Sequence, residues 1–149
     1  MLTFTSCKDG IIEVPEFTFE STVYVCDTYT LYRRNGSDTK ALVLTLQASD
    51  LPNTTGTGTL NSSGRTVLYR VFDGAIGSAY FCSEVPPVSP QVVEEWTGTA
   101  FSITIDTVED ISTSPITHHH TITLNDLVLS RNDEQEIFEE FYFGLVDTE

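Results

Sequence analysis

The chain has 149 residues, close to the commonest length of a single protein domain and enough to enclose a hydrophobic core. Its 22 acidic and 7 basic side chains give a formal net charge of −15, which argues against electrostatic binding of nucleic-acid phosphates or anionic lipid headgroups. No apolar run is long enough for a transmembrane helix, and no internal repeat of fixed period is present. The sequence therefore predicts one acidic domain that does not bind nucleic acid.

Alternation of apolar and polar residues predicts an all-β fold of about eight short strands with almost no helix. This pattern favours a single antiparallel β-sandwich, Ig-like only in the broad sense, with a β-barrel as the alternative architecture. The expected strands cover 17–26, 29–33, 40–47, 96–106, 116–129 and 137–146, and two more are joined by a Gly-rich turn within 65–82. The strand that begins at Arg65 has apolar side chains on both faces, so we expect it to be central.

Segments rich in turn-forming residues separate these strands. Residues 50–64 contain Pro, Asn, Ser, Thr and Gly and are expected to form a long loop or a frayed hairpin. Residues 83–95 contain three prolines and are expected to cross between sheets, because proline cannot donate to a strand ladder. Asn125 and Asp126 interrupt the alternation before Leu127, which predicts a β-bulge that exchanges the two faces of the strand.

The first seven residues, MLTFTSC, place a short apolar stretch and two small residues directly before Cys7. The segment Phe4-Thr5-Ser6-Cys7 resembles the lipobox of bacterial lipoproteins of the Bacteroidota type, although Phe4 stands where a lipobox usually has Leu. In that family the signal peptide is cleaved before the cysteine, which is then lipidated. The resemblance implies that residues 1–16 are a signal-peptide remnant, lipidation site and tether, and that residues 17–149 form the β-sandwich domain.

The same resemblance has consequences for the other cysteines and for location. If Cys7 is lipidated, Cys26 and Cys82 remain to form a disulfide, which suits an exported protein. The implied location is the cell envelope, with the domain held at the outer membrane by its lipid and facing the periplasm or the cell surface. The triplet Asp106-Thr107-Val108 also resembles the short O-glycosylation motif of exported Bacteroidota proteins, which implies Thr107 as a glycosylation site.

Three consecutive histidines are the most conspicuous local motif. On a strand, His118 and His120 project to the same side, roughly 6 to 7 Å apart, a spacing compatible with two ligands of a zinc or copper ion if a neighbour supplies a third. The alternative is that both rings are hydrogen-bonded at the edge of the core while His119 is solvated.

Calcium is a second cofactor alternative, because acidic loops supply the hard oxygen ligands that this ion prefers. The candidate groups are Asn132, Asp133 and Glu134 in one loop and Asp106, Glu109 and Asp110 in another. Neither group has EF-hand spacing, and charge runs of this kind usually form a solvated rim.

The sequence does not predict an enzyme. It contains no GxSxG nucleophile motif and no Gly-rich phosphate loop followed by lysine. The adjacent pairs Glu94-Glu95 and Glu139-Glu140 would point to opposite faces of a strand and could not flank one glycosidic bond.

A binding role is expected instead, with an unidentified protein or glycan partner. β-Domains often present exposed aromatic side chains to such ligands, and the candidates are Trp96, Tyr29, Tyr32, Tyr69, Tyr80 and Tyr142, most of which should be buried. The expected function is a lipid-anchored, non-catalytic binding or structural accessory module. The alternatives are a metal-binding protein or metal-dependent enzyme that uses His118 and His120, and an adhesin or pilus-like subunit.

Overall fold

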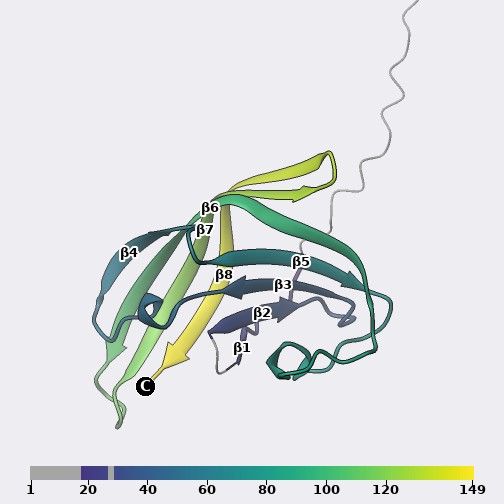
Figure 1. Ribbon diagram of the computed structural model, residues 1–149. Helices are drawn as coiled ribbons and strands as arrows, with labels where there is room; N and C mark the ends of the chain where they lie inside the picture. Colours follow the sequence, from purple (N-terminus) through teal and green to yellow (C-terminus); the bar gives the residue numbers. More distant parts are fainter. Residues whose placement is uncertain (1–17, 27–28) are drawn as a thin grey trace, which may run out of the picture.

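A computed structural model describes residues 18–26 and 29–149, which form a nearly all-β chain (Figure 1). Its strands are β1 (Tyr24–Cys26), β2 (Thr30–Arg34), β3 (Lys40–Thr45), β4 (Gly56–Asn61), β5 (Thr66–Phe72), β6 (Val92–Asp110), β7 (Thr117–Arg131) and β8 (Glu134–Thr148). Helix in these ranges is limited to the 3-10 turns Ala48–Asp50 and Tyr80–Cys82. No helix in the described part of the chain is long and apolar enough to cross a membrane. Cys7 and the tether predicted for 1–16 lie outside the described residues.

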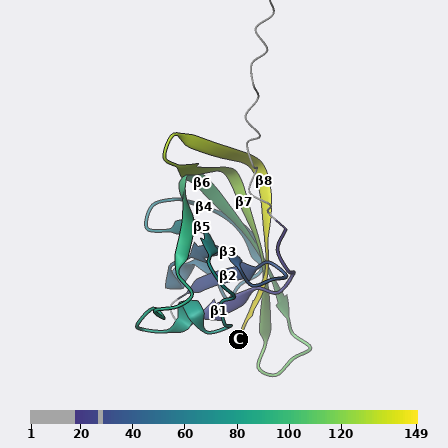
Figure 2. The same ribbon diagram turned by 90° about the vertical axis from the view of Figure 1, so that its right-hand side faces the viewer.

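The eight described strands form one antiparallel sheet in the order β1-β2-β3-β5-β6-β7-β8, with β4 paired to β6. β6 is 19 residues long, so its first part pairs with β5 and its second part with β4. The sheet curls into a half-barrel, as the two views in Figures 1 and 2 show. The predicted all-β fold of about eight strands is confirmed, and the curled sheet is related to both architectures that the sequence favoured.

The central strands bury apolar side chains on both faces. On β5, Val67, Tyr69 and Val71 pack into a large cluster on the concave side, whereas Leu68 and Phe72 pack into a second cluster on the opposite side. β3 alternates between the two clusters in the same way. The prediction that the strand beginning near Arg65 is central is therefore confirmed.

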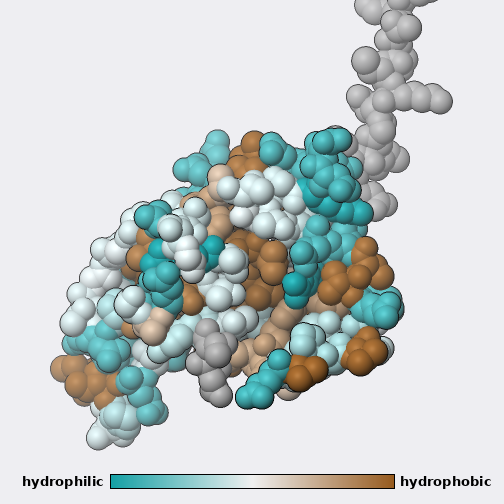
Figure 3. Space-filling model, viewed as in Figure 1, coloured by the Kyte–Doolittle hydropathy of each residue, from teal (hydrophilic) through white to brown (hydrophobic). Residues whose placement is uncertain are grey.

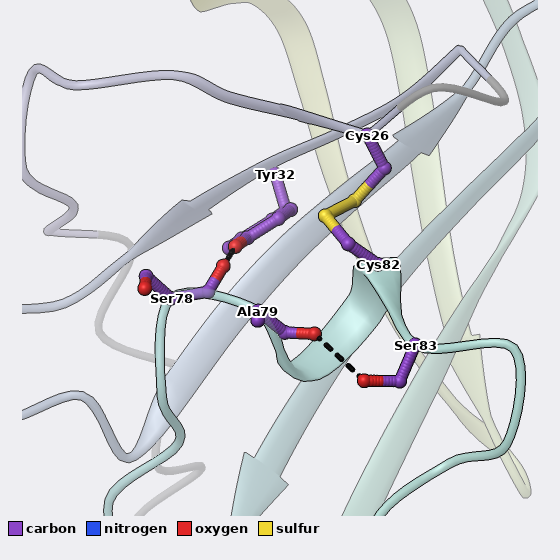
Figure 4. Close-up of a disulfide and its surroundings, with 6 residues drawn as sticks. All are labelled: Cys26, Tyr32, Ser78, Ala79, Cys82 and Ser83. Atoms are coloured by element: carbon purple, nitrogen blue, oxygen red, sulfur yellow. Dashed lines mark hydrogen bonds between the residues drawn. A yellow bond between two sulfur atoms is a disulfide. The ribbon is translucent and has the colours of Figure 1, made fainter.

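The second cluster lies beneath the loop 73–91, and a disulfide holds that loop in place. The buried members of the cluster are Cys26, Tyr32, Ala41, Val43, Phe72 and Ile76. Cys26 at the end of β1 is bonded to Cys82 in the loop, with their Cα atoms 5.1 Å apart (Figure 4). The Tyr32 hydroxyl donates a hydrogen bond to the Ser78 carbonyl of the same loop. The predicted Cys26–Cys82 disulfide is confirmed, and it covers the second cluster.

Four segments differ from the sequence prediction. Of the strand expected at 17–26, only Tyr24–Cys26 is a strand among the described residues. The crossover expected at 83–95 contains the start of β6, which begins at Val92 and pairs with β5. The chain after β5 does not return as a strand, because Gly and Pro are concentrated in 73–91, and only the 3-10 turn Tyr80–Cys82 is regular there. Residues 50–64 contain β4, whose sequence GTGTLN offers Leu60 as its single large apolar side chain. β4 therefore has no hydrophobic alternation of its own, and it is stabilised as a strand by pairing with β6.

The predicted bulge in β7 is confirmed. Burial passes from Ile122 and Leu124 to Leu127 and Leu129, so the buried positions change from even to odd numbers at this point. Asp126 between them has a φ of 49°, a left-handed conformation that aspartate tolerates better than most residues.

An arginine side chain joins the two sides of the half-barrel. Arg33 on β2 is 9% exposed, and its guanidinium donates hydrogen bonds to the Phe143 carbonyl of β8 at 2.9 Å and to the Glu20 carbonyl at 2.8 Å. Gly144 has a φ of 150°, and a Cβ atom there would meet Val23 at 2.3 Å. Segment 18–23 and β8 can therefore approach closely only because residue 144 is glycine.

Removal of the disulfide tests how strongly the loop 73–91 depends on it. The bond joins residues 56 positions apart, and the chain-entropy model predicts that its loss lowers the free energy of unfolding by about 4 kcal/mol. The measurement is chemical denaturation of the Cys26→Ser, Cys82→Ser variant beside the oxidised protein. Equal stability of the two proteins would contradict this role.

Replacement of Arg33 tests the closure of the half-barrel. Arg33→Met keeps the apolar stem but leaves buried carbonyl groups of β8 and segment 18–23 without donors, so the free energy of unfolding should fall by about 3 kcal/mol. The matched control is Arg70→Met, which removes a half-exposed ion pair with Glu95 at 2.6 Å and should cost less than about 1 kcal/mol. Similar losses in urea denaturation of the two variants would show that Arg33 has no special role.

Candidate functional site

His118 and His120 lie on the concave side of β7 near its start. Their rings are stacked with centroids 6.5 Å apart, and both side chains are buried. Nδ1 of His120 lies 2.8 Å from Oγ1 of Thr107, and Nε2 lies 2.8 Å from Oγ1 of Thr148. His118 Nε2 is 3.9 Å from Glu109 Oε1, and its Nδ1 is buried without a hydrogen-bond partner.

This geometry does not provide a metal centre. Both ring nitrogens of His120 are already hydrogen-bonded to threonine hydroxyl groups. In residues 18–26 and 29–149, no three His, Cys, Asp or Glu side chains are grouped so that they could hold a metal ion. The described residues therefore do not support the zinc or copper alternative for His118 and His120. His120 matches the alternative of a hydrogen-bonded ring at the edge of the core, whereas the buried His118 has an ion-pair contact with Glu109 at 3.9 Å and an unpartnered Nδ1.

Thr107 is also part of this inner cluster. Its side chain is fully buried, and its hydroxyl contacts His120. A glycan on this oxygen would have no space in the folded domain. The burial of Thr107 argues against the O-glycosylation that the sequence triplet implied.

The acidic residues considered as calcium ligands do not converge. Glu109 faces the concave side beside His118, whereas Asp106 and Asp110 carry their carboxylates on the other side of β6. Asn132 and Asp133 are the two turn residues between β7 and β8, and Asn132 has a φ of 51°. These residues form a tight hairpin turn rather than an ion-binding loop.

His119 lies on the opposite side of β7 and links three strands. Its Nδ1 is 2.6 Å from Asp147 Oδ1 on β8, and its Nε2 is 3.7 Å from Asp110 Oδ2 on β6. The hydrogen bond to Asp147 is the largest cause that raises the pKa of His119. Burial, by contrast, lowers the pKa of His120. The pKa values of the adjacent residues His119 and His120 are thus shifted in opposite directions.

A shallow recess lies within the loop 73–91, which the disulfide holds in place. It has a volume of about 280 Å³ and is lined by Ala75, Gly77, Ala79, Tyr80, Ser83, Pro87, Ser89 and Pro90. Tyr80 donates a hydrogen bond to the Pro90 carbonyl at 3.3 Å, and no carboxylate or imidazole lines the recess. Ligand pockets usually measure about 300 to 1,000 Å³ and contain several convergent polar groups. The recess is therefore a weaker candidate than the outer surface of the sheet.

The structure places three of the six aromatic candidates in the core, Tyr80 at intermediate burial against the second cluster, and two at the surface. Trp96, Tyr32 and Tyr69 are buried, as base rates suggested. Tyr142 on β8 is 55% exposed, and Tyr29 is 36% exposed. Tyr142 is thus the most exposed of the six candidates.

Tyr142 lies at the end of an ordered surface on the outer side of β4, β6, β7 and β8, which we call the hydroxyl face. Directly paired residues on neighbouring strands project to the same side, so the strand register defines rows across this surface. Its three rows are Asn61-Ser102-Asn125-Glu140, Thr59-Thr104-Thr123-Tyr142 and Thr57-Asp106-Thr121-Leu145. Five of these twelve side chains are threonines.

Bonding within the hydroxyl face leaves several hydroxyl groups available. Asn125 donates to the Thr104 hydroxyl at 2.9 Å, and Thr57 donates to Asp106 at 2.8 Å. Thr121 and Thr123 make no side-chain hydrogen bond within the described part of the chain. In Figure 3 the flank over β4, at the left, is mostly pale, the colour of residues whose hydropathy is near zero.

A bulge in β8 completes the edge of this face. Tyr142 and Leu145 are three positions apart and would project to opposite sides of a regular strand. The register shifts between Ile122 and Thr123, opposite Phe143, so Tyr142 pairs with Thr123 and Leu145 pairs with Thr121. Both side chains therefore lie on the outer side, where they are 55% and 49% exposed. Simple alternation of residues in the sequence does not reveal this arrangement.

Comparison of the chain with protein-family models, with curated proteins and with solved structures finds no match. The candidate site therefore rests on the geometry of the hydroxyl face.

The two shifted histidines predict opposite effects of pH on stability. Stabilisation from His119 is present below its ordinary pKa of 6.5 and is lost as the pH rises through its raised folded pKa. Stabilisation from His120 is present above 6.5 and is lost as the pH falls through its lowered folded pKa. Between pH 8 and pH 5, His119→Gln should therefore lose more stability than wild type, and His120→Gln should lose less. Denaturant titrations at both pH values test this, and identical changes in the two variants would contradict it.

Proposed function

We propose that the chain is an exported β-domain anchored in the cell envelope by a lipid on Cys7, where it serves as a non-catalytic binding module. The observation that carries this proposal is the Cys26–Cys82 bond. Structural disulfides form and persist mainly in oxidising compartments outside the cytosol. A bond that fixes a loop over a hydrophobic cluster is of this structural kind.

The arrangement of the cysteines supports the anchor. Two of the three cysteines are bonded to each other, so Cys7 is the cysteine outside the bridge. It follows the lipobox-like segment Phe4-Thr5-Ser6. The domain would then be held at the outer membrane, facing the periplasm or the cell surface.

The environments of the ionisable groups support a role in binding rather than in catalysis. Glu94 accepts a hydrogen bond from Trp96 at 2.6 Å, and Glu95 pairs with Arg70 at 2.6 Å. These carboxylates therefore have structural partners, as does His120. The hydroxyl face, by contrast, is an ordered surface that offers many hydrogen-bonding groups.

Mass spectrometry of the gene product, expressed with its natural upstream region, tests the anchor. We expect a mature N-terminus at Cys7 that carries acyl chains, and recovery of the protein with membranes. Cys7→Ser should move the protein to the soluble fraction, whereas the control Cys26→Ser, Cys82→Ser should remain with membranes. An unmodified Cys7 that follows an intact upstream sequence would contradict the proposal.

A further inference from the structure

We propose that the hydroxyl face binds a neutral polysaccharide, with Tyr142 as the platform against which a sugar ring packs. This inference rests on the proposed binding function and names its ligand class. The observations that carry it are the cross-strand rows of threonines, their strand pairing, the exposed tyrosine at one end and the charges of the surrounding groups.

The hydroxyl groups of this face are held in a fixed arrangement. Neighbouring strands are about 4.8 Å apart and residues rise about 3.4 Å along a strand, so the three rows over four strands cover about 14 Å in each direction. Threonine has few side-chain rotamers because it is branched at Cβ. Thr104, Thr121 and Thr123 lie on strands that are paired on both sides. Ligand binding at these residues therefore costs little conformational entropy.

The polar groups of the hydroxyl face are complementary to those of sugars. A sugar hydroxyl both donates and accepts hydrogen bonds, as a threonine hydroxyl does. Asp106 and Glu140 supply stronger acceptors, and Asn125 supplies an amide, so the face can bond several hydroxyl groups at once. Tyr142, which is 55% exposed, adds a flat apolar ring with a polar tip.

Charge restricts the ligand to a neutral one. No Lys or Arg belongs to the three rows, and the whole chain carries a formal charge of −15. Asp106 and Glu140 would repel uronate, sulfate or phosphate groups at contact distance. Acidic glycans and nucleic acids therefore do not suit this face.

The composition of the face favours a glycan over a protein partner. Protein interfaces are anchored by a desolvated apolar centre rich in Trp, Tyr, Met and Arg. The centre of the hydroxyl face holds Thr104, Thr123 and Thr121, and its two large apolar side chains, Tyr142 and Leu145, lie at one edge. A protein partner would find no central anchor there.

Affinity electrophoresis tests the inference, because an acidic chain migrates readily in native gels. The probes are dextran, xylan, mannan, laminarin and hydroxyethyl cellulose as neutral polymers, with alginate as an acidic polymer. We expect at least one neutral polymer to retard the wild-type protein, and alginate to leave it unretarded. Tyr142→Ala should weaken the apparent affinity at least about tenfold.

Two further variants keep the test decisive. Thr123→Glu places a bulky charge in the middle row and should abolish retardation. The matched control Ile137→Ala removes another exposed side chain of β8, 67% accessible and outside the three rows, and should bind as wild type does. A cooperative thermal unfolding transition verifies that each variant is folded. If Tyr142→Ala does not fold, glycan binding by Thr123→Glu alone tests the role of the hydroxyl face.

The outcomes separate this inference from the proposed function. No retardation by any neutral polymer, equal retardation by alginate, or unchanged binding by folded Tyr142→Ala and Thr123→Glu would each overturn the ligand assignment. Acylation of Cys7 in the mass-spectrometric experiment would leave the anchored module standing even then. Glycan binding by a protein with unmodified Cys7 would keep the ligand and reject the anchor.

Discussion

The bond between Cys26 and Cys82 is the constraint on which the two-sided burial of the central strands depends. The curl of the sheet covers the concave faces of β2, β3 and β5, but it leaves their other faces bare. The loop 73–91 covers those faces without a strand or a long helix of its own. Besides the disulfide, its anchors include the bond from Tyr32 and a bond from Arg34 to the Ile76 carbonyl at 3.1 Å. Structural disulfides of this kind are typical of proteins that fold in oxidising compartments.

The way the half-barrel closes explains why a polar face remains on its outer side. Arg33 and the segment 18–23 join β2 to β8, so the concave side is filled by the main hydrophobic cluster. The loop 73–91 packs against the other side of the sheet around β1, β2, β3 and β5. The outer side of β4, β6, β7 and β8 therefore meets solvent, which accounts for its threonines. Strand pairing arranges these threonines in rows, in which Thr57 and Thr59 are exposed and Thr104, Thr121 and Thr123 are half-buried.

Alternation of apolar and polar residues predicted most of the strands. It could not predict β4 or the hydroxyl face, because both depend on how distant strands pair. The two faces of β5 and the bulge at Asp126 were readable because each depends on neighbouring residues. β4 was missed since its Gly and Thr residues become a strand only beside β6, which is distant in sequence. The hydroxyl face depends on the pairing of four strands and on a bulge in β8. The burial of Thr107 could not be predicted from its triplet, because three residues do not reveal that the hydroxyl contacts His120 on a neighbouring strand.

The bond between Cys26 and Cys82 can form only where the chain meets an oxidising environment. The most direct measurement is alkylation of intact cells of the native host with iodoacetamide, followed by denaturation, proteolysis without reductant and mass spectrometry of the peptides that contain Cys26 and Cys82. The account predicts a disulfide-linked pair of peptides in which neither cysteine is alkylated. Recovery of both peptides separately, each alkylated on its cysteine, would contradict export, the covered second cluster and the anchored module together.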